Sequence, residues 1–384
     1  MLICVSCTNA FCSSDSLIHS ILLRLNEMQV HHEPYFPQGL FPSYREYARN
    51  PGRLKKDENI FFTGLIGFTL KRIRPQLSDN DKLLCDSIIN RIAIVAPKFK
   101  NQAGRNTYNF WATDTPKIFP NAGWLNLFDK KLALADDFDD TSIMLLALNT
   151  TNATAEEVHQ LMQHFTNTQA KTAKTTLPVY KNMGAYSVWF GKKMVVELDA
   201  CVICNTLSMV QTYNLNWTKV DSTSLDFLVR MVENNDYILH PGKIAVIYKT
   251  TPIILYHLAR LMSIKPIDAL EKLKPLLINA ALAEYAKAAT LPDKIILRTA
   301  LLRWGVAKEK EDIFTSDIST AVEQEKDFVF FIANLASTLP AWLAFPLVDS
   351  GITRFYFYSP AYNDALLLEY LVEQKKYDTN VLTN

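Results

Sequence analysis

One pattern recurs along this chain and limits the folds open to it: a short polar segment followed by an almost wholly apolar stretch of helical length. A helix that is apolar on every face must be buried on every face, so it belongs inside the fold. The polar residues before it supply side chains that cap its first turn. We therefore expect four inner helices, at residues 60–68, 141–148, 200–210 and 253–261, entered from the polar segments 55–59, 136–140, 197–199 and 248–252.

Amphipathic stretches separate these segments, with apolar residues three and four positions apart at 81–96, 154–165 and 225–233. That spacing is typical of helices that cover an inner layer with one face. Glycine is scarce, with 11 residues in 384, which leaves few positions for the positive-φ turns that sheets need. The sequence therefore predicts an all-α fold, an α/α barrel (toroid) of inner and outer helices, built by residues 15–384 as a single domain.

In such a barrel the inner helices start at one end, where their dipoles, capping carboxylates and loop aromatic residues meet in a cavity. The acidic run at 136–140 is the strongest candidate for a site there. Crowded, buried carboxyl groups raise one another's pKa, so that one of them stays protonated and can act as an acid. The run also has a structural interpretation, in which Asp137, Asp139 and Asp140 cap a helix, with Asp139 or Asp140 as the capping residue.

The segment Ala135-Asp136-Asp137-Phe138-Asp139-Asp140-Thr141 resembles the D-x-D-D-T motif of class II terpene cyclases and the α/α toroids related to them. The resemblance implies that Asp139, the middle aspartate, delivers a proton to a carbon–carbon double bond. It also implies that Asp137 and Asp140 keep Asp139 acidic and oriented. The similarity runs from about Asp57 to Tyr370 and includes Tyr108-Asn109-Phe110-Trp111, Phe119-Pro120, residues 186–190 before 197–199, and Tyr358-Ser359-Pro360-Ala361.

Protonation of a double bond forms a carbocation, which needs a dry cavity faced by aromatic rings. We expect a hydrophobic small-molecule substrate of the isoprenoid class, and no cofactor. Two features depart from the family: the glutamine-tryptophan repeats of triterpene cyclases are absent, and the chain is too short for two stacked barrels, so a substrate needs another roof. The candidate substrate-binding residues are Trp111, Trp124, Tyr186, Trp189, Asp199, Tyr256 and His257.

Two other functions are compatible with the same barrel. Glycoside hydrolases and lyases, secreted or periplasmic, pair two carboxylates across a sugar that stacks on tryptophan. Asp57 or Glu58 with Asp137 or Asp199 would form such a pair. A non-catalytic barrel that binds a lipid or a partner protein would use the acidic run only as a cap. A D-D-x-x-D magnesium site is disfavoured, because the residues at 317–323 have the wrong spacing for its second motif.

Metal and nucleic-acid binding are not predicted. Cys201 and Cys204 form a C-x-x-C inside an apolar segment, and no second pair completes a zinc site. His159 and His164 are five positions apart, which places them on different faces of a helix. The formal net charge of +1 gives no long-range attraction to nucleic acid.

The N-terminal segment bears on the compartment. Residues 1–11 carry no charge and include Thr8-Asn9-Ala10, the small residues expected before a signal-peptidase site. We therefore expect residues 1–14 to be a remnant signal segment, the alternative being a frayed start to a helix at 16–27. A signal would direct the protein to the periplasm or outside the cell, and without one the protein would be cytoplasmic.

A second uncharged stretch, residues 328–348, is long enough to cross a bilayer. Pro340 and Pro346 interrupt it, and a helix broken in this way exposes backbone groups that lipid cannot satisfy. We expect two buried helical pieces, or a patch in peripheral contact with a membrane, rather than a membrane-spanning helix.

Overall fold

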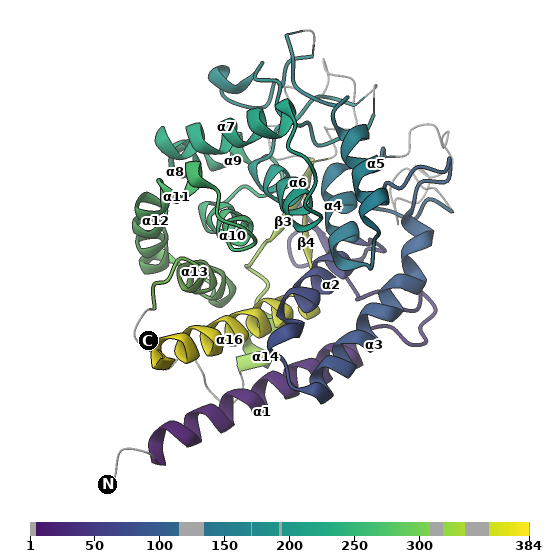
Figure 1. The fold of residues 1–384 in the computed structure, drawn as a ribbon. Helices are drawn as coiled ribbons and strands as arrows, with labels where there is room; N and C mark the ends of the chain where they lie inside the picture. Colours follow the sequence, from purple (N-terminus) through teal and green to yellow (C-terminus); the bar gives the residue numbers. More distant parts are fainter. Residues whose placement is uncertain are drawn as a thin grey trace.

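Helices make up most of the computed structural model, and a small antiparallel sheet lies among them (Figure 1). The structure describes residues 5–114, 134–169, 171–191, 194–307, 318–334 and 353–383, leaving aside the side chains of 5–14, 334 and 383. The prediction of a mainly helical fold is confirmed. A sheet of four short strands, which was not predicted, accompanies the helices.

Within the described residues, six helices contact one another in turn, and the last of them contacts the first. They are almost completely buried along their apolar segments, as expected of helices without a polar face. Four of them match the predicted inner helices, and the other two were not predicted as inner helices. These central helices are α2 (Phe61–Ile73), α4 (Phe138–Ala147), α6 (Ala200–Thr212), α10 (Thr251–Met262), α13 (Leu291–Arg303) and α16 (Pro360–Thr383).

Other helices pack on the outside of the central helices. The helix α1 (Val5–Met28) contacts α16 and α3 (Asp79–Val95), and α3 contacts α2. The helix α12 (Lys274–Lys287) contacts α10 and α13. The remaining helices are α5 (Asn152–Met162), α7 (Lys219–Glu233), α8 (Asp236–Leu239), α9 (Pro241–Ile244), α11 (Asp268–Glu271) and α14 (Ile318–Gln324), with 3-10 turns at Arg74–Gln76, Ala96–Phe99 and Pro178–Tyr180.

The sheet has the order β2 (Lys55–Lys56), β1 (Tyr44–Tyr47), β4 (Arg354–Tyr358) and β3 (Phe331–Asn334). Figure 1 shows β3 and β4 near the middle of the molecule, among the central helices. A helical piece was expected after residue 328, but residues 331–334 form the strand β3, so this expectation is wrong there. Aromatic residues favour strands when cross-strand partners are available, and Phe331 pairs with Phe357 in register. Those partners are remote in sequence, so local periodicity does not reveal them.

Two glycines allow α2 to lie close to its neighbours. A Cβ atom on Gly64 would lie 2.9 Å from Met144 Sδ on α4, and one on Gly67 would lie 2.9 Å from Ile92 Cδ1 on α3. Both distances are shorter than an ordinary van der Waals contact. The two glycines therefore have a packing role inside a helix, where glycine is otherwise unfavourable.

The residues just before three central helices pair with later segments of the chain. Single antiparallel bridges join Asn59 to Trp111 before α2, Asp137 to Trp189 before α4, and Asp199 to Ala245 before α6. Each bridge holds the first turn of a helix against an extended loop. The loops therefore gather around the same end of the helices.

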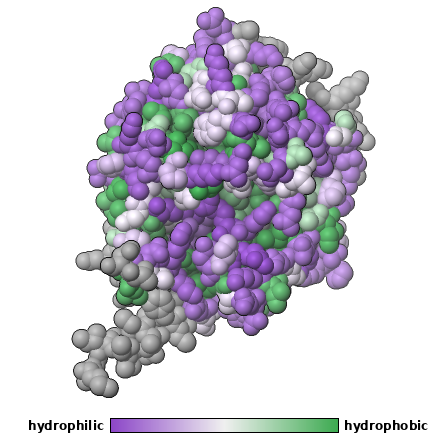
Figure 2. All heavy atoms as spheres, in the orientation of Figure 1, coloured by the Kyte–Doolittle hydropathy of each residue, from purple (hydrophilic) through white to green (hydrophobic). Residues whose placement is uncertain are grey.

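The expectations about membranes have mixed outcomes. None of the described helices combines the length and the apolar character needed to cross a membrane. On the described part of the face in Figure 2, hydrophobic residues form small patches between hydrophilic ones. Residues 335–350 lie outside the described residues, so peripheral contact stays a prediction. The remnant signal segment also stays a prediction, because residues 1–4 and the side chains of 5–14 are not among the described residues.

Candidate functional site

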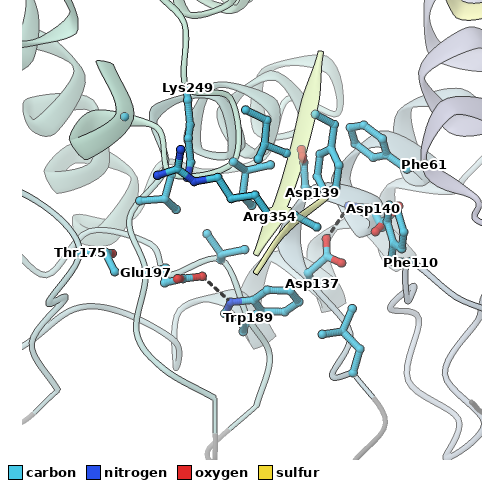
Figure 3. Close-up of a pocket in the computed structure, with 18 of the residues that line it drawn as sticks. Phe61, Phe110, Asp137, Asp139, Asp140, Thr175, Trp189, Glu197, Lys249 and Arg354 are labelled. Carbon is cyan, nitrogen blue, oxygen red and sulfur yellow. Dashed lines mark hydrogen bonds between the residues drawn. The ribbon is translucent and has the colours of Figure 1, made fainter. Parts of the chain in front are cut away.

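A cavity of about 310 Å³ lies at the starts of four central helices. It is lined by Phe61 at the start of α2, three aspartates around the start of α4, Glu197 before α6 and Lys249 before α10. Most of its surface is apolar, and the aromatic residues Phe61, Phe110, Trp111, Trp189 and Phe331 contribute to it. The first residues of α2 and α4 and the segments just before α6 and α10 therefore face one space (Figure 3).

The small sheet closes part of this cavity. The strand β3 contributes Phe331, Ile332 and Ala333 to the lining, and β4 contributes Arg354. The ring of Phe331 stacks on Phe110 with centroids 5.4 Å apart, and its centroid lies 4.9 Å from that of Phe61. Two strands thus line the cavity at the helix ends, where a substrate was expected to need a cover other than a second barrel.

Asp137 is the residue that caps α4, so the prediction of Asp139 or Asp140 as the cap is wrong. Its backbone is extended, and Oδ1 accepts a hydrogen bond of 2.7 Å from the backbone N–H of Asp140. An N-cap needs extended backbone, whereas Asp139 and Asp140 already lie within the first helical turn. The cap position is therefore filled two or three residues earlier than expected.

Asp137 and Asp140 form a coupled pair of carboxyl groups beside the cavity. The interaction between the two carboxyl groups favours the ionised form of Asp137 and the protonated form of Asp140. Burial raises the pKa of Asp137 to about 7. Burial and the neighbouring Asp137 carboxylate raise the pKa of Asp140 well above its ordinary value. Asp140 Oδ1 is buried and has no hydrogen-bond partner among the residues that the structure describes.

Asp139 lines the same cavity but has different partners. Its Oδ1 accepts a hydrogen bond of 2.6 Å from Asn205 Nδ2 on α6, and the Tyr248 hydroxyl donates to its Oδ2. Burial raises the pKa of Asp139 to about 6, although Tyr248, Asn205 and the charge of Arg260 act in the opposite direction. Asp139 is therefore an acid whose neutral and ionised forms are both accessible near neutral pH.

Asp136 has a structural position in the same run and does not belong to the cavity lining. Its Oδ2 accepts hydrogen bonds of 2.6 Å from both Asn101 and Thr107 and one of 3.3 Å from Arg105. These bonds tie the loop before Phe110 to the start of α4. Asp136 therefore helps to position an aromatic wall of the cavity.

Charged residues occupy another part of the lining. Lys243, Lys249, Arg354 and Glu197 all contribute to it. Glu197 Oε2 accepts a hydrogen bond of 3.0 Å from the Trp189 indole nitrogen. In Figure 3 the three aspartates gather beside Phe61 and Phe110, with Lys249 and Glu197 on the other side of the drawn space. The cavity thus combines an acidic region, an aromatic wall and a region with cations.

The predicted substrate-binding residues are divided between the cavity and the surrounding core. Trp111 and Trp189 line the cavity, and Trp124 lies outside the described residues. Tyr186 and Asp199 are not part of the lining. The Tyr186 hydroxyl donates to Asp221 at 2.6 Å, and Asp199 caps α6 while accepting from the backbone N–H of Ile247 at 2.7 Å.

Tyr256 and His257, also predicted to bind substrate, lie on the buried part of α10 and outside the cavity lining. Tyr256 donates a hydrogen bond to Glu369 of α16 at 2.5 Å. His257 Nδ1 lies 2.8 Å from the backbone oxygen of Ile253, and burial lowers the pKa of His257 well below its ordinary value. His257 is therefore a neutral core histidine that does not contact the acidic run.

Two of the carboxylates suggested for a glycosidase pair, Asp57 and Asp199, are engaged outside the cavity. Asp57 is fully buried and accepts hydrogen bonds from Arg45 at 2.6 Å and from the Trp111 indole nitrogen at 3.1 Å. It does not line the cavity, and Asp199 is a helix cap. Of the glycosidase candidates that were named, Asp137 alone lines the cavity, where Glu197 is a further carboxylate.

The described residues contain no group of three or more histidine, cysteine or carboxylate side chains arranged to hold a metal ion. Cys201 and Cys204 are buried free thiols within α6. Burial raises the pKa of both thiols, which makes them poor nucleophiles and poor metal ligands. The buried C-x-x-C therefore has a packing role.

Several cavity residues escape prediction from sequence, among them Lys249, Arg354 and Phe331. A short repeat does point to the two tryptophans, because Y-x-x-W occurs at 108–111 and again at 186–189. In both copies the tryptophan lines the cavity and pairs with a residue close to the start of a central helix, Asn59 before α2 and Asp137 before α4. The strand residues have no comparable signal, since they reach the cavity through pairing between distant segments.

Comparison of the chain with models of protein families, with curated proteins and with solved structures finds no match.

Proposed function

We propose that this protein is an α/α toroid that starts a carbocation reaction on an apolar, isoprenoid-type substrate by protonating a carbon–carbon double bond. The closed order of contacts among the central helices supports the toroid. One observation carries the functional proposal. Three buried aspartates with raised pKa values line an aromatic cavity at the start of α4.

Asp139 is the proton donor in this proposal. Its O–H bond breaks as the π electron pair of the alkene forms a new C–H bond, which leaves a carboxylate and a carbocation. Loss of a proton from the carbocation to water, and uptake of a proton by Asp139, returns both to their neutral forms. With a pKa of about 6, roughly a tenth of the molecules carry the Asp139 proton at pH 7.

The coupled pair Asp137 and Asp140 interacts electrostatically with the donor. The charge of an ionised Asp139 raises the pKa of both carboxyl groups, and the same repulsion opposes ionisation of Asp139 wherever the pair carries a charge. The N-terminus of α4 favours the carboxylate that forms afterwards, because the helix dipole places partial positive charge there.

The walls of the cavity suit an apolar substrate. The faces of Phe61, Phe110, Trp111, Trp189 and Phe331 offer electron density to a carbocation. Exclusion of water by these rings protects a carbocation from capture before the reaction ends. The volume of about 310 Å³ lies within the range of small-molecule sites.

A carbohydrate-active enzyme is the second candidate, and one observation favours it. Glu197 and Asp137 line the same cavity as two tryptophans, Trp111 and Trp189, the residue types that glycosidases use for catalysis and stacking. The predominantly apolar lining disfavours this candidate, because a sugar needs many polar partners. A Glu197→Gln variant separates the two, since it should stop glycan cleavage and leave an Asp139-dependent reaction largely intact.

The deciding experiment incubates wild-type protein and Asp139→Asn with isoprenyl diphosphates and with squalene, with product detection by mass spectrometry. Wild type should form cyclised products, faster as the pH falls toward 6, and Asp139→Asn should form none while remaining folded. Turnover by the asparagine variant would remove Asp139 as the acid. Inactivity of the wild type on every isoprenoid, together with binding of them, would favour a non-catalytic lipid-binding barrel.

A further inference from the structure

Behind Asp139 lies a chain of buried polar residues that the lining of the cavity does not include. Asn205 on α6 donates from Nδ2 to Asp139 Oδ1, and its own Oδ1 accepts a hydrogen bond of 2.6 Å from Arg260 Nη2 on α10. Asn205, Arg260 and Tyr248 are each at most 1% exposed. Residues of α6, of α10 and of the loop before α10 thus hold the carboxyl group of Asp139 in place.

The donor-only chemistry of arginine decides which way the Asn205 amide points. A guanidinium group has five N–H donors and no acceptor, so the atom of Asn205 that faces Arg260 must be its oxygen. The amide nitrogen then has to face Asp139 Oδ1. Arg260 itself is held against the rings of Phe68 and Tyr256, with its Cζ 5.1 and 5.2 Å from their centroids.

A fixed amide has a consequence for the proton on Asp139. Oδ1 of Asp139 faces the N–H donor of Asn205, so a proton bound to Oδ1 would point at the N–H proton. The Asp139 proton therefore belongs on Oδ2, which is the oxygen hydrogen-bonded to Tyr248. A hydroxyl both donates and accepts, so Tyr248 serves the neutral and the ionised form of Asp139. Burial and the neighbouring Asp139 raise the pKa of Tyr248 well above its ordinary value, which keeps the hydroxyl neutral.

We propose that Arg260 and Asn205 are positioning residues that hold the Asp139 proton on Oδ2 beside Tyr248, and that Arg260 stabilises the carboxylate left when that proton departs. This proposal rests on the proposed function in taking Asp139 as the donor. The positive charge of Arg260 lowers the pKa of Asp139, as expected of a cation that favours the ionised form. Arg260 acts through Asn205 and does not touch the cavity.

The test measures the protonation of Asp139 directly, without substrate. Protein labelled with ¹³C at aspartate carboxyl groups is titrated by NMR, and Asp139→Asn identifies the Asp139 signal. Arg260→Gln, Asn205→Leu and Tyr248→Phe should each raise the pKa of Asp139 by about one unit or more, because each removes a group that favours the carboxylate. Arg298→Gln is the matched control, since Arg298 is also a buried arginine packed on two tyrosine rings.

Folding of each variant is checked by circular dichroism, and Tyr248→Phe, which removes only a hydroxyl group, decides the outcome if Arg260→Gln does not fold. An unchanged Asp139 titration in folded Tyr248→Phe and in folded Arg260→Gln or Asn205→Leu would overturn the proposal. With an active substrate, kcat should fall and its pH profile should move with the measured pKa, while KM stays within about twofold. Shifted titrations in a protein inactive on all isoprenoids would retain the positioning roles and reject the proposed function.

Discussion

The backbone N–H of Asp140 donates to the side chain of Asp137 at 2.7 Å, so the helix cap of α4 belongs to the same carboxyl pair that lies beside the cavity. Capping and acid chemistry thus depend on one residue. This relationship explains why the acidic run has both a structural and a chemical interpretation, and it allows the two to be separated by substitution at Asp137.

Asp137→Asn should retain most of the stability, because asparagine caps a helix almost as well as aspartate. Asp137→Ala should lower the free energy of unfolding by about 1 kcal/mol or more, since the N–H of Asp140 loses its acceptor. Urea unfolding followed by circular dichroism measures both. Equal losses for the two variants would show that the charge of Asp137, and not its capping oxygen, stabilises α4.

Stability should fall as the pH rises from about 4 to about 8. Burial raises the pKa of Asp137 to about 7 and that of Asp139 to about 6, and it also raises the pKa of Asp140 well above its ordinary value, so the folded protein holds protons that the unfolded chain has already released. Folding is favoured wherever the folded state binds more protons, and this stabilisation is lost as the pH passes the folded pKa values.

Asp140→Asn tests the source of this pH dependence, because an amide does not titrate in either state. The variant should flatten the profile of Tm against pH and gain stability relative to wild type at pH 8, because it removes a buried carboxyl group whose ionisation burial disfavours. Asp86→Asn, at a half-exposed carboxylate paired with Arg74, is the control. An unaltered profile in Asp140→Asn would mean that Asp140 is ionised in the folded protein.

Ala333→Trp should block the cavity without touching the acidic run. Ala333 lies on β3 and lines the cavity, so a tryptophan there occupies space that an apolar ligand needs. Binding of farnesyl diphosphate or farnesol, measured by calorimetry, should weaken at least tenfold, which corresponds to about 1.4 kcal/mol. Ala103→Trp, at an exposed loop position, should bind as wild type does. Equal affinity in both variants would place the ligand elsewhere.

Asp57→Ala should destabilise the fold strongly. Asp57 and Arg45 form a buried ion pair of 2.6 Å between the loop before α2 and the sheet. Burial lowers the pKa of Arg45 and raises that of Asp57 despite their attraction, so removing one partner leaves a buried, uncompensated charge, at a cost of about 3–5 kcal/mol. The comparison variant is Asp86→Ala, whose pair with Arg74 is half-exposed, so its loss should change the stability far less. Similar losses from denaturant unfolding would argue against this account.

The sequence was sufficient to predict four central helices and to single out the acidic run, because both depend on local patterns. An apolar segment after polar residues predicts burial at any point in a chain, and α6 begins at the predicted residue. Adjacent aspartates predict a shared electrostatic environment, which is why Asp139 was a reasonable candidate acid.

The remaining parts of the fold and site depend on contacts between distant residues. Arg354 and Phe331 reach the cavity because β4 pairs with β1 and β3, which no local periodicity encodes. Tyr256 is aromatic and lies on a central helix, as a cavity residue would, yet it faces Glu369 of α16. Which face of a fully apolar helix points toward a cavity is set by its neighbours, so the sequence of the helix alone does not determine it.

The pairing of β1 with β4 has a consequence for the order of folding. Tyr44 pairs with Tyr358, and α1 packs on α16, so the two ends of the described chain are joined in one structure. Contacts of such large sequence separation form late, after the entropy of closing a long loop has been overcome. During synthesis on the ribosome, β1 cannot pair with β4 until β4 has emerged. The cavity wall that carries Arg354 is therefore among the last parts of the protein to assemble, and an active site would appear only once the chain has closed on itself.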